Sequence, residues 1–148
     1  MAMESLKLSA TDPEDLVVLS SILQDATVLI GDMGFDDGQF MMVAARFIAA
    51  EDQNNLPNTN PKAKSHEGIK GVRKLMGINF AGVSKVMRQG FSPDARDDVL
   101  NILAIRANQA NIEIVFSGKS MVRLECDAIR VYAADLGEGW STSFAPSH

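Results

Sequence analysis

Gly118, Lys119 and Ser120 are the part of this sequence that comes nearest to a phosphate-binding motif. A phosphate-binding loop reads GxxxxGK(S/T), and its backbone amides cradle phosphates ahead of a helix. Here Glu113 stands where the first glycine of that pattern belongs, and the segment lies between two short apolar runs with strand character. We therefore predict a hairpin turn at this position instead of a nucleotide site.

Asp32, Asp36 and Asp37 lie close together and carry the oxygen ligands that calcium prefers. Their spacing lacks the alternating ligands and the distal glutamate of an EF-hand loop, so we predict a turn here. The sequence also has one cysteine and two histidines that stand 82 positions apart. Such a set predicts no metal cluster, and we expect no metal and no cofactor.

Cys126 is the thiol available for nucleophilic catalysis. It alternates in phase with Val122 and Leu124, which places it on the buried face of a strand, where thiols are usually inert. His66 stands far away along the chain in a polar segment, and no GxSxG elbow occurs. We predict no catalytic residue. Whether the protein is an enzyme is left open, but we favour a protein without catalytic activity.

Arg46, Arg106 and Arg123 fall inside runs with strand character. An arginine in a strand either pairs with a carboxylate on a neighbouring strand or binds an anionic ligand through its planar fork. We favour structural pairing. If the fold has a pocket between sheet and helix, these three arginines and Asp32 are the predicted ligand-binding residues.

Positive charge is concentrated in one part of an acidic chain. The net charge is −5, yet half of the 14 lysines and arginines lie between residues 62 and 88 with a single acid. This basic strip consists of Lys62, Lys64, Lys70, Arg73, Lys74, Lys85 and Arg88. Such a strip attracts acidic proteins, phosphate-rich ligands or nucleic acids, but we favour a solvated segment that balances the acidic surface. We expect no nucleic-acid partner, because the only aromatics among or next to these cations, Phe80 and Phe91, fit strand packing and the sequence pI is near 4.9.

The length of 148 residues predicts a single domain, 1–148. The chain is 46% hydrophobic and 22% charged, which is typical of a folded protein. Its longest strictly apolar run covers residues 40–45, far short of the roughly 20 residues of a membrane span, and the N-terminus lacks a signal-peptide pattern. We expect a cytoplasmic protein without a membrane partner.

The first elements are a short strand at residues 6–10 and a helix that ends near Asp25. Asp12 is suited to cap the first turn of this helix, and Pro13 fits its first position. Two strand-like runs follow at residues 27–35 and 39–49, and the Asp-Gly turn between them predicts a hairpin. Residues 50–71 are polar and predict a long mobile loop within the domain.

A strand-like segment at residues 72–90, bent near Ala81 and Gly82, precedes a meander of three strands at residues 99–106, 112–116 and 121–126. Asp127 is suited to cap a final helix that ends near Leu136. We therefore predict an α+β fold: a strongly bent antiparallel sheet or partial barrel of about six to seven strands, with an N-terminal and a C-terminal helix. A pleckstrin-homology-like or a helix-grip-like arrangement fits this order.

Three distinctive runs are LKLSATDPEDLVVLSSILQDA at the start, VLNILAIRA in the second half and IEIVFSGKSMVRLECDAIRVYAADLG near the end. With these runs the sequence resembles an uncharacterised bacterial family, domain of unknown function 2948. The similarity covers nearly the whole chain and matches least at residues 49–74. The resemblance implies a cytoplasmic bacterial protein with no assigned activity, cofactor or catalytic residue.

The function that we expect is therefore a non-catalytic interaction module that binds through its surface or through an exposed strand edge. Homodimerisation through a sheet edge is a further expectation. The alternative is a small anionic-ligand-binding protein, or an unrecognised enzyme, with a pocket between sheet and helix.

Overall fold

A computed structural model describes residues 6–49 and 71–136 as nine antiparallel strands in one sheet and one α-helix. The strand order is β1-β9-β4-β3-β2-β6-β7-β8-β5. The elements in chain order are β1 (Lys7–Ala10), α1 (Pro13–Leu23), β2 (Thr27–Asp36), β3 (Gln39–Ala49), β4 (Gly71–Phe80), β5 (Val83–Gln89), β6 (Val99–Asn108), β7 (Asn111–Phe116), the short 3-10 turn η2 (Ser117–Lys119), β8 (Ser120–Cys126) and β9 (Val131–Asp135).

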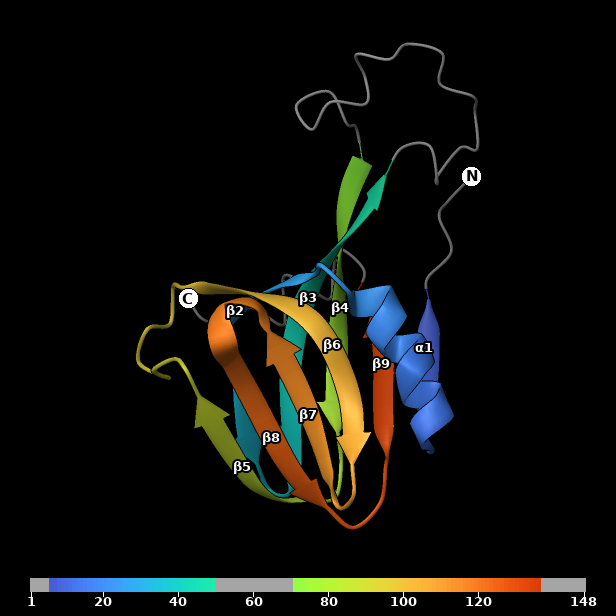
Figure 1. The fold of residues 1–148 in the computed structure, drawn as a ribbon. Coiled ribbons are helices and arrows are strands. Elements are labelled where there is room, and N and C mark those ends of the chain that lie inside the picture. Colours follow the sequence, from blue (N-terminus) through green and yellow to red (C-terminus); the bar gives the residue numbers. More distant parts are fainter. Residues whose placement is uncertain (1–5, 50–70, 137–148) are drawn as a thin grey trace.

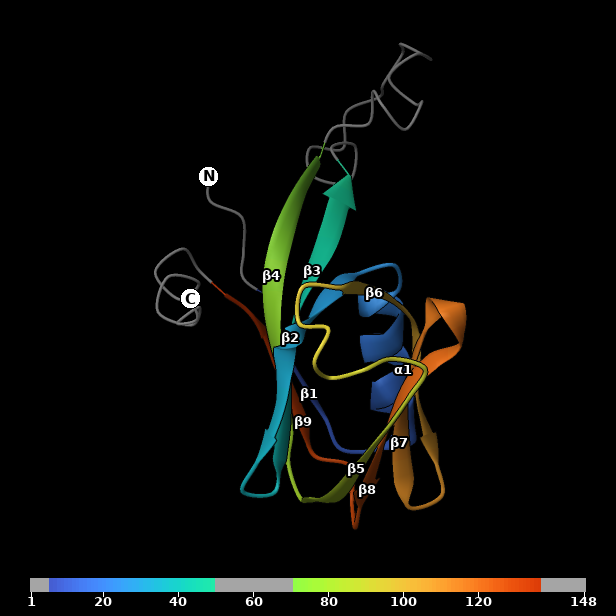
Figure 2. The ribbon, with the colours of Figure 1, turned by 90° about the vertical axis from the view of Figure 1, so that its left-hand side faces the viewer.

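The sheet folds over into two facing layers (Figures 1 and 2). β1, β9, β4, β3 and β2 form one layer, and β6, β7, β8 and β5 form the other. β6 joins the two layers, because its first residues pair with β2 and its remainder pairs with β7. The predicted antiparallel sheet and the final meander are confirmed.

The predicted α+β fold class is wrong: the described residues form mostly sheet, with nine strands and one helix, and the largest difference lies at the C-terminal end. The segment expected to form the second helix contains β9, which pairs with β4 on one side and with β1 on the other. Val131 and Ala133 are buried and Tyr132 is exposed, so the burial alternates with the period of a strand. The sheet has nine strands instead of six to seven, and the pleckstrin-homology-like and helix-grip-like arrangements are overturned, since no helix follows β8 among the described residues.

The start of α1 follows the predicted capping. The Asp15 amide donates to Oδ1 of Asp12 at 2.8 Å, and the Asp15 carboxylate accepts from the Thr11 amide at 2.9 Å. Pro13 occupies the first turn, where its missing N–H costs nothing. The helix ends at Leu23, slightly before the predicted end at Asp25.

The predicted turns are also present. Asp37 (φ 53°) and Gly38 (φ 76°) both adopt positive φ between β2 and β3, as a tight hairpin turn requires. Gly118 (φ 77°) and Lys119 (φ 67°) form the turn before β8, which confirms a hairpin at the GKS sequence. Gly82 (φ 70°) marks the bend that separates β4 from β5. The predicted loop at 50–71 lies outside the described residues, apart from its last position in β4.

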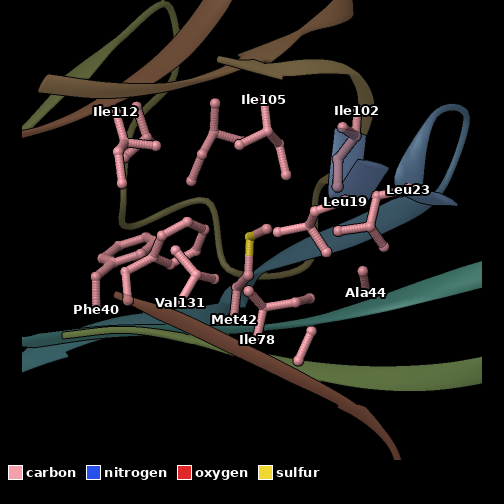
Figure 3. Packing of buried hydrophobic residues seen from close by; sticks show 14 of the residues in the cluster. Leu19, Leu23, Phe40, Met42, Ala44, Ile78, Ile102, Ile105, Ile112 and Val131 are labelled. Atoms are coloured by element: carbon pink, nitrogen blue, oxygen red, sulfur yellow. The ribbon is translucent and has the colours of Figure 1, made fainter. Parts of the chain in front are cut away.

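One apolar cluster fills the space between the layers (Figure 3). Phe40, Met42 and Ile78 of one layer and Ile105 and Ile112 of the other are at most 2% exposed. The inner face of α1 contributes to the same cluster through Leu16, Leu19 and Leu23. Cys126 is buried with them, as its phase in β8 predicts.

α1 lies along β6 and completes the hydrogen bonding of that strand. Beyond Ile102 the register of β6 against β7 shifts at Leu103, which is typical of a bulge. The Ile105 amide then donates to Oγ of Ser20 on α1 at 2.9 Å. This contact fixes the position of the second half of β6 relative to the helix.

Candidate functional site

Three charged side chains form a row across the outer face of the β6–β7–β8 layer. Arg106, Glu113 and Arg123 are direct register partners on adjacent strands. They face outward, because Ile112 and Ile114 on either side of Glu113 point into the core. Nε of Arg106 lies 2.8 Å from Oε1 of Glu113, and Nη2 of Arg123 lies 3.3 Å from Oε2.

The Glu113 carboxylate is enclosed although it lies on an outer face. Its side chain is 3% exposed, against 59% for Arg106 and 41% for Arg123. The hydrogen bond from Arg106 lowers the pKa of Glu113; burial opposes this, while the Asn108 amide at 3.2 Å and the charges of both arginines reinforce it. The carboxylate is therefore held in its ionised form between two guanidinium groups.

Part of each guanidinium remains available for another anion. In the hydrogen bonds found over the described residues, Arg106 uses only Nε toward Glu113. Arg123 forms an ion pair with Glu113 through Nη2, and its Nε is buried without a hydrogen-bond partner in this part of the chain. Another anion would therefore meet the exposed parts of the two side chains, 59% of Arg106 and 41% of Arg123. Two guanidinium groups share one carboxylate, so the row carries a net positive charge and oriented N–H donors, an arrangement that binds carboxylates or phosphates.

An open groove between α1 and β6 adjoins this row. Its volume is about 380 Å³, and Arg106 lines it. Val17 on the helix is 67% exposed and Leu103 on the strand is 46% exposed, so the groove has an apolar surface beside the guanidinium. The α1–β6 groove is lined by Val17, Ser20, Ser21, Gln24, Leu103, Ala104, Ile105 and Arg106.

Arg46 lies in a separate ion pair within the other layer. Its Nε and Nη2 donate to the two carboxylate oxygens of Asp135 at 3.2 and 2.8 Å, and the Leu6 amide donates to Oδ2 at 3.0 Å. Burial raises the pKa of Asp135, but the bonds from Arg46 and Leu6 and the charges of Arg46 and Lys74 outweigh it, so the pKa is lowered. The structure thus brings Arg106 and Arg123 together and leaves Arg46 apart, paired across strands as favoured from the sequence.

Asp32 belongs to neither arginine cluster. It is exposed on β2, and the charged group that influences it is Arg96. Partial burial raises the pKa of Asp32, and attraction by Arg96 opposes the rise. Among the described residues, no three His, Cys, Asp or Glu side chains are placed to hold a metal ion.

The basic strip is not one surface in the part of the chain that the structure describes. Arg73 and Lys74 lie at the start of β4, whereas Lys85 and Arg88 lie on β5, which is not adjacent to β4 in the sheet and begins beyond the opposite end of β4 (Figure 1). Lys62, Lys64 and Lys70 fall outside the described residues.

A second groove lies on the outer face of β3, β4 and β9, and its lining is almost entirely apolar. Its volume is about 140 Å³, and Met41 (43% exposed) and Tyr132 (49% exposed) flank Asn79, their register partner. Oδ1 of Asn79 is buried and, within the described residues, has no hydrogen-bond partner. This outer groove is lined by Met41, Met42, Gly77, Ile78, Asn79, Tyr132, Ala134 and Leu136.

The sequence model of the family described as Protein of unknown function (DUF2948) matches residues 6–148. The chain belongs to this family. Comparisons with curated proteins and with solved structures gave no match. The DUF2948 match includes both grooves and both arginine sites, and it continues beyond β9 to the last residue.

The sequence offered a pocket between sheet and helix only as an alternative, and of its four predicted lining residues Arg106 alone lines the α1–β6 groove. The outer groove was not predicted. The sequence does hold a sign of the α1–β6 groove: Val17 and Val18 are apolar, yet they fall outside the stripe of residues that the helical spacing predicts to be buried. For the outer groove, the alternation in residues 39–49 places Met41 and Met42 on opposite faces of the strand, but this apolar pattern predicted burial of both faces. No helix in the described ranges is long and apolar enough to cross a membrane.

Proposed function

We propose that this protein is a non-catalytic interaction module that binds an acidic, partly apolar segment of a protein partner. The binding surface consists of the α1–β6 groove together with Arg106 and Arg123. One observation supports the proposal above the others: Arg106 lies both in the row with Glu113 and at the groove that exposes Val17 and Leu103. A partner that offers carboxylates next to apolar side chains satisfies both surfaces.

Glu113 has the role of a positioning residue in this proposal. It holds the guanidinium group of Arg106 by a hydrogen bond and that of Arg123 by an ion pair, so that both lose less conformational freedom when a partner binds. The partner then meets oriented donors instead of flexible side chains. A small anion alone would leave the exposed Val17 and Leu103 unused, and for this reason a protein segment fits better than a free ligand.

The sheet edges offer weaker binding surfaces than this groove. β1 has four residues, and β5 carries exposed Lys85 and Arg88, two features by which proteins protect edges from strand addition. We therefore place the partner in the groove, and homodimerisation through an edge is the less favoured arrangement. The proposal includes a bacterial cytoplasmic location, which suits a chain with one unpaired cysteine.

A labelled peptide tests the proposal. A short fluorescein-labelled peptide of alternating leucine and glutamate is titrated with the protein, and fluorescence anisotropy gives the dissociation constant. We expect saturable binding that Arg106→Gln weakens about tenfold, which corresponds to about 1.4 kcal/mol. Leu103→Gln also weakens binding, because it replaces an exposed apolar contact of the groove.

Arg88→Gln is the matched control, since it makes the same change in net charge on β5, away from the groove. Unchanged affinity in this variant supports a specific site. An equal loss in both arginine variants, or equal binding of a leucine and lysine peptide, would show unspecific attraction and contradict the proposal.

A further inference from the structure

The outer groove of β3, β4 and β9 exposes Met41 and Tyr132 around an apolar surface. We propose that residues 137–148 of the same chain bind in this groove, with Trp140 against Met41 and Tyr132. The inference concerns the opposite layer from the α1–β6 groove and does not depend on the proposed function.

The position of Leu136 brings this segment to the groove. The Leu136 amide donates to the carbonyl of Leu75 at 2.8 Å, and Leu136 itself lines the groove beside Gly77. Its Cδ2 lies 3.3 Å from the point where a Cβ on Gly77 would be, so only glycine gives this side chain full room. The Leu136 side chain therefore already lies on the outer face of the sheet, immediately before residue 137.

The length of the segment allows Trp140 to reach the groove. Four residues beyond Leu136 span at most about 14 Å when fully extended. Tyr132 lies four residues back from Leu136 along β9, about 13 Å, and Met41 lies two strand spacings across from Tyr132, roughly 10 Å, because β4 lies between β9 and β3. Trp140 therefore meets these residues through its own long side chain and theirs, once the chain has doubled back over β9. Gly137 and Gly139 stand before Trp140 in the sequence and permit the reversal that would direct the chain back over the sheet.

The chemistry of Trp140 matches that of the groove. It is the single tryptophan of the chain, and its indole combines a large apolar ring with one N–H donor and no acceptor. The groove offers apolar walls and one buried acceptor without a partner in the described residues, Oδ1 of Asn79. The family match also extends through residue 148, so this segment belongs to the family's domain.

Intrinsic fluorescence of the full chain tests the inference, because Trp140 is its only tryptophan. We expect an emission maximum at shorter wavelength than that of N-acetyltryptophanamide, together with weaker quenching by acrylamide. Met41→Gln and Tyr132→Ser shift both quantities to the values of the free amide. Leu103→Gln, a residue of similar exposure in the other layer, leaves them unchanged.

A second measurement follows the indole N–H, which gives one signal in a ¹H–¹⁵N spectrum. Asn79→Ala moves this signal and speeds its exchange with solvent, while Leu103→Gln does neither. The inference is overturned if the wild-type emission equals that of the free amide, or if Trp140 stays protected in the Met41 and Tyr132 variants. It is also overturned if the wavelength shift disappears on dilution, since the bound segment would then belong to a second copy.

Discussion

At the scale of single residues, Glu113 shows how an ion cluster forms on an outer sheet face. The carboxylate accepts hydrogen bonds from Arg106 and Asn108 and forms an ion pair with Arg123, and these neighbours leave only 3% of its side chain exposed. A buried carboxylate is tolerated when its oxygens are satisfied by charged donors. Because both arginines remain partly in solvent, they attract the carboxylate less strongly than fully buried partners would.

Glu113→Gln is expected to lower the free energy of unfolding by about 1.5–3 kcal/mol at neutral pH, the range for hydrogen bonds to a charged group. The pKa of Glu113 is lowered from its ordinary value of 4.5, so its stabilisation is complete above that value and is lost as the pH falls through the lowered pKa. The difference between wild type and variant therefore shrinks in acid. Urea unfolding at a series of pH values measures it.

Glu125→Gln on β8 serves as the control, because it removes the same charge from a strand next to β7 without touching the Arg106–Glu113 bond. A constant difference between wild type and Glu113→Gln down to strongly acidic pH would contradict this account. Asp135 also has a lowered pKa, but it is present in both proteins and cancels in the comparison.

The buried phase of Cys126 implied the outward direction of Arg123, whereas the outward direction of Arg106 depends on the register shift at Leu103 and was not predicted. The ion pairing favoured for both arginines is present. Their shared partner was not predicted, because Glu113 was considered only as a missing glycine of a phosphate loop. Identifying it requires the register that places Arg106, Glu113 and Arg123 in one row. Register depends on long-range pairing, which single-strand periodicity does not specify.

At the scale of elements, Gly90 lets the chain turn away from the end of β5. Its φ is 84°, and a Cβ added there would lie 2.5 Å from the carbonyl oxygen of Lys119 and 2.9 Å from Cα of Ser120. Both neighbours are backbone atoms, so they cannot move aside as a side chain would. In addition, Oγ of Ser120 donates to the carbonyl of Gly90 at 3.2 Å and fixes this approach.

Gly90→Ala is therefore expected to destabilise the protein by more than about 2 kcal/mol, since left-handed backbone alone costs an alanine about 1–2 kcal/mol. Gly34→Ala is the matched control: a Cβ there meets nothing within 4 Å, and its φ is not positive. Thermal unfolding of both variants checks the contrast. Equal melting temperatures would show that the segment after β5 adapts freely.

β9 explains why the final element was predicted as a helix. Ile129, Tyr132 and Leu136 fit helical spacing, and Asp127 is a good capping residue. The structure instead forms a strand, because backbone groups on both sides of β9 pair with β4 and β1. Those partners lie more than 50 residues away, so a local pattern could not reveal them, whereas α1 and the Asp37-Gly38 hairpin depend on adjacent residues and were predicted correctly.

At the scale of the whole molecule, one apolar cluster connects both layers and α1 (Figure 3). β2 and β6 join the layers through three register pairs, Thr27–Asn101, Val28–Leu100 and Leu29–Val99. The helix supplies the remaining connection, since Leu19 lies in the cluster with no exposed surface and Ser20 binds the Ile105 amide. The layers therefore depend on each other for burial and should unfold together.

Leu19→Ala tests this dependence. It is expected to lower the free energy of unfolding by about 2–5 kcal/mol, because it leaves a cavity where α1 meets both layers. Val18→Ala, at a residue 48% exposed on the same helix, changes it by no more than about 0.5 kcal/mol. In wild type and in both variants, urea transitions followed by far-ultraviolet circular dichroism and by amide resonances of β4 and β7 should coincide. If β7 lost its resonances before β4, the layers would be separate folding units, and α1 would merely cover one of them.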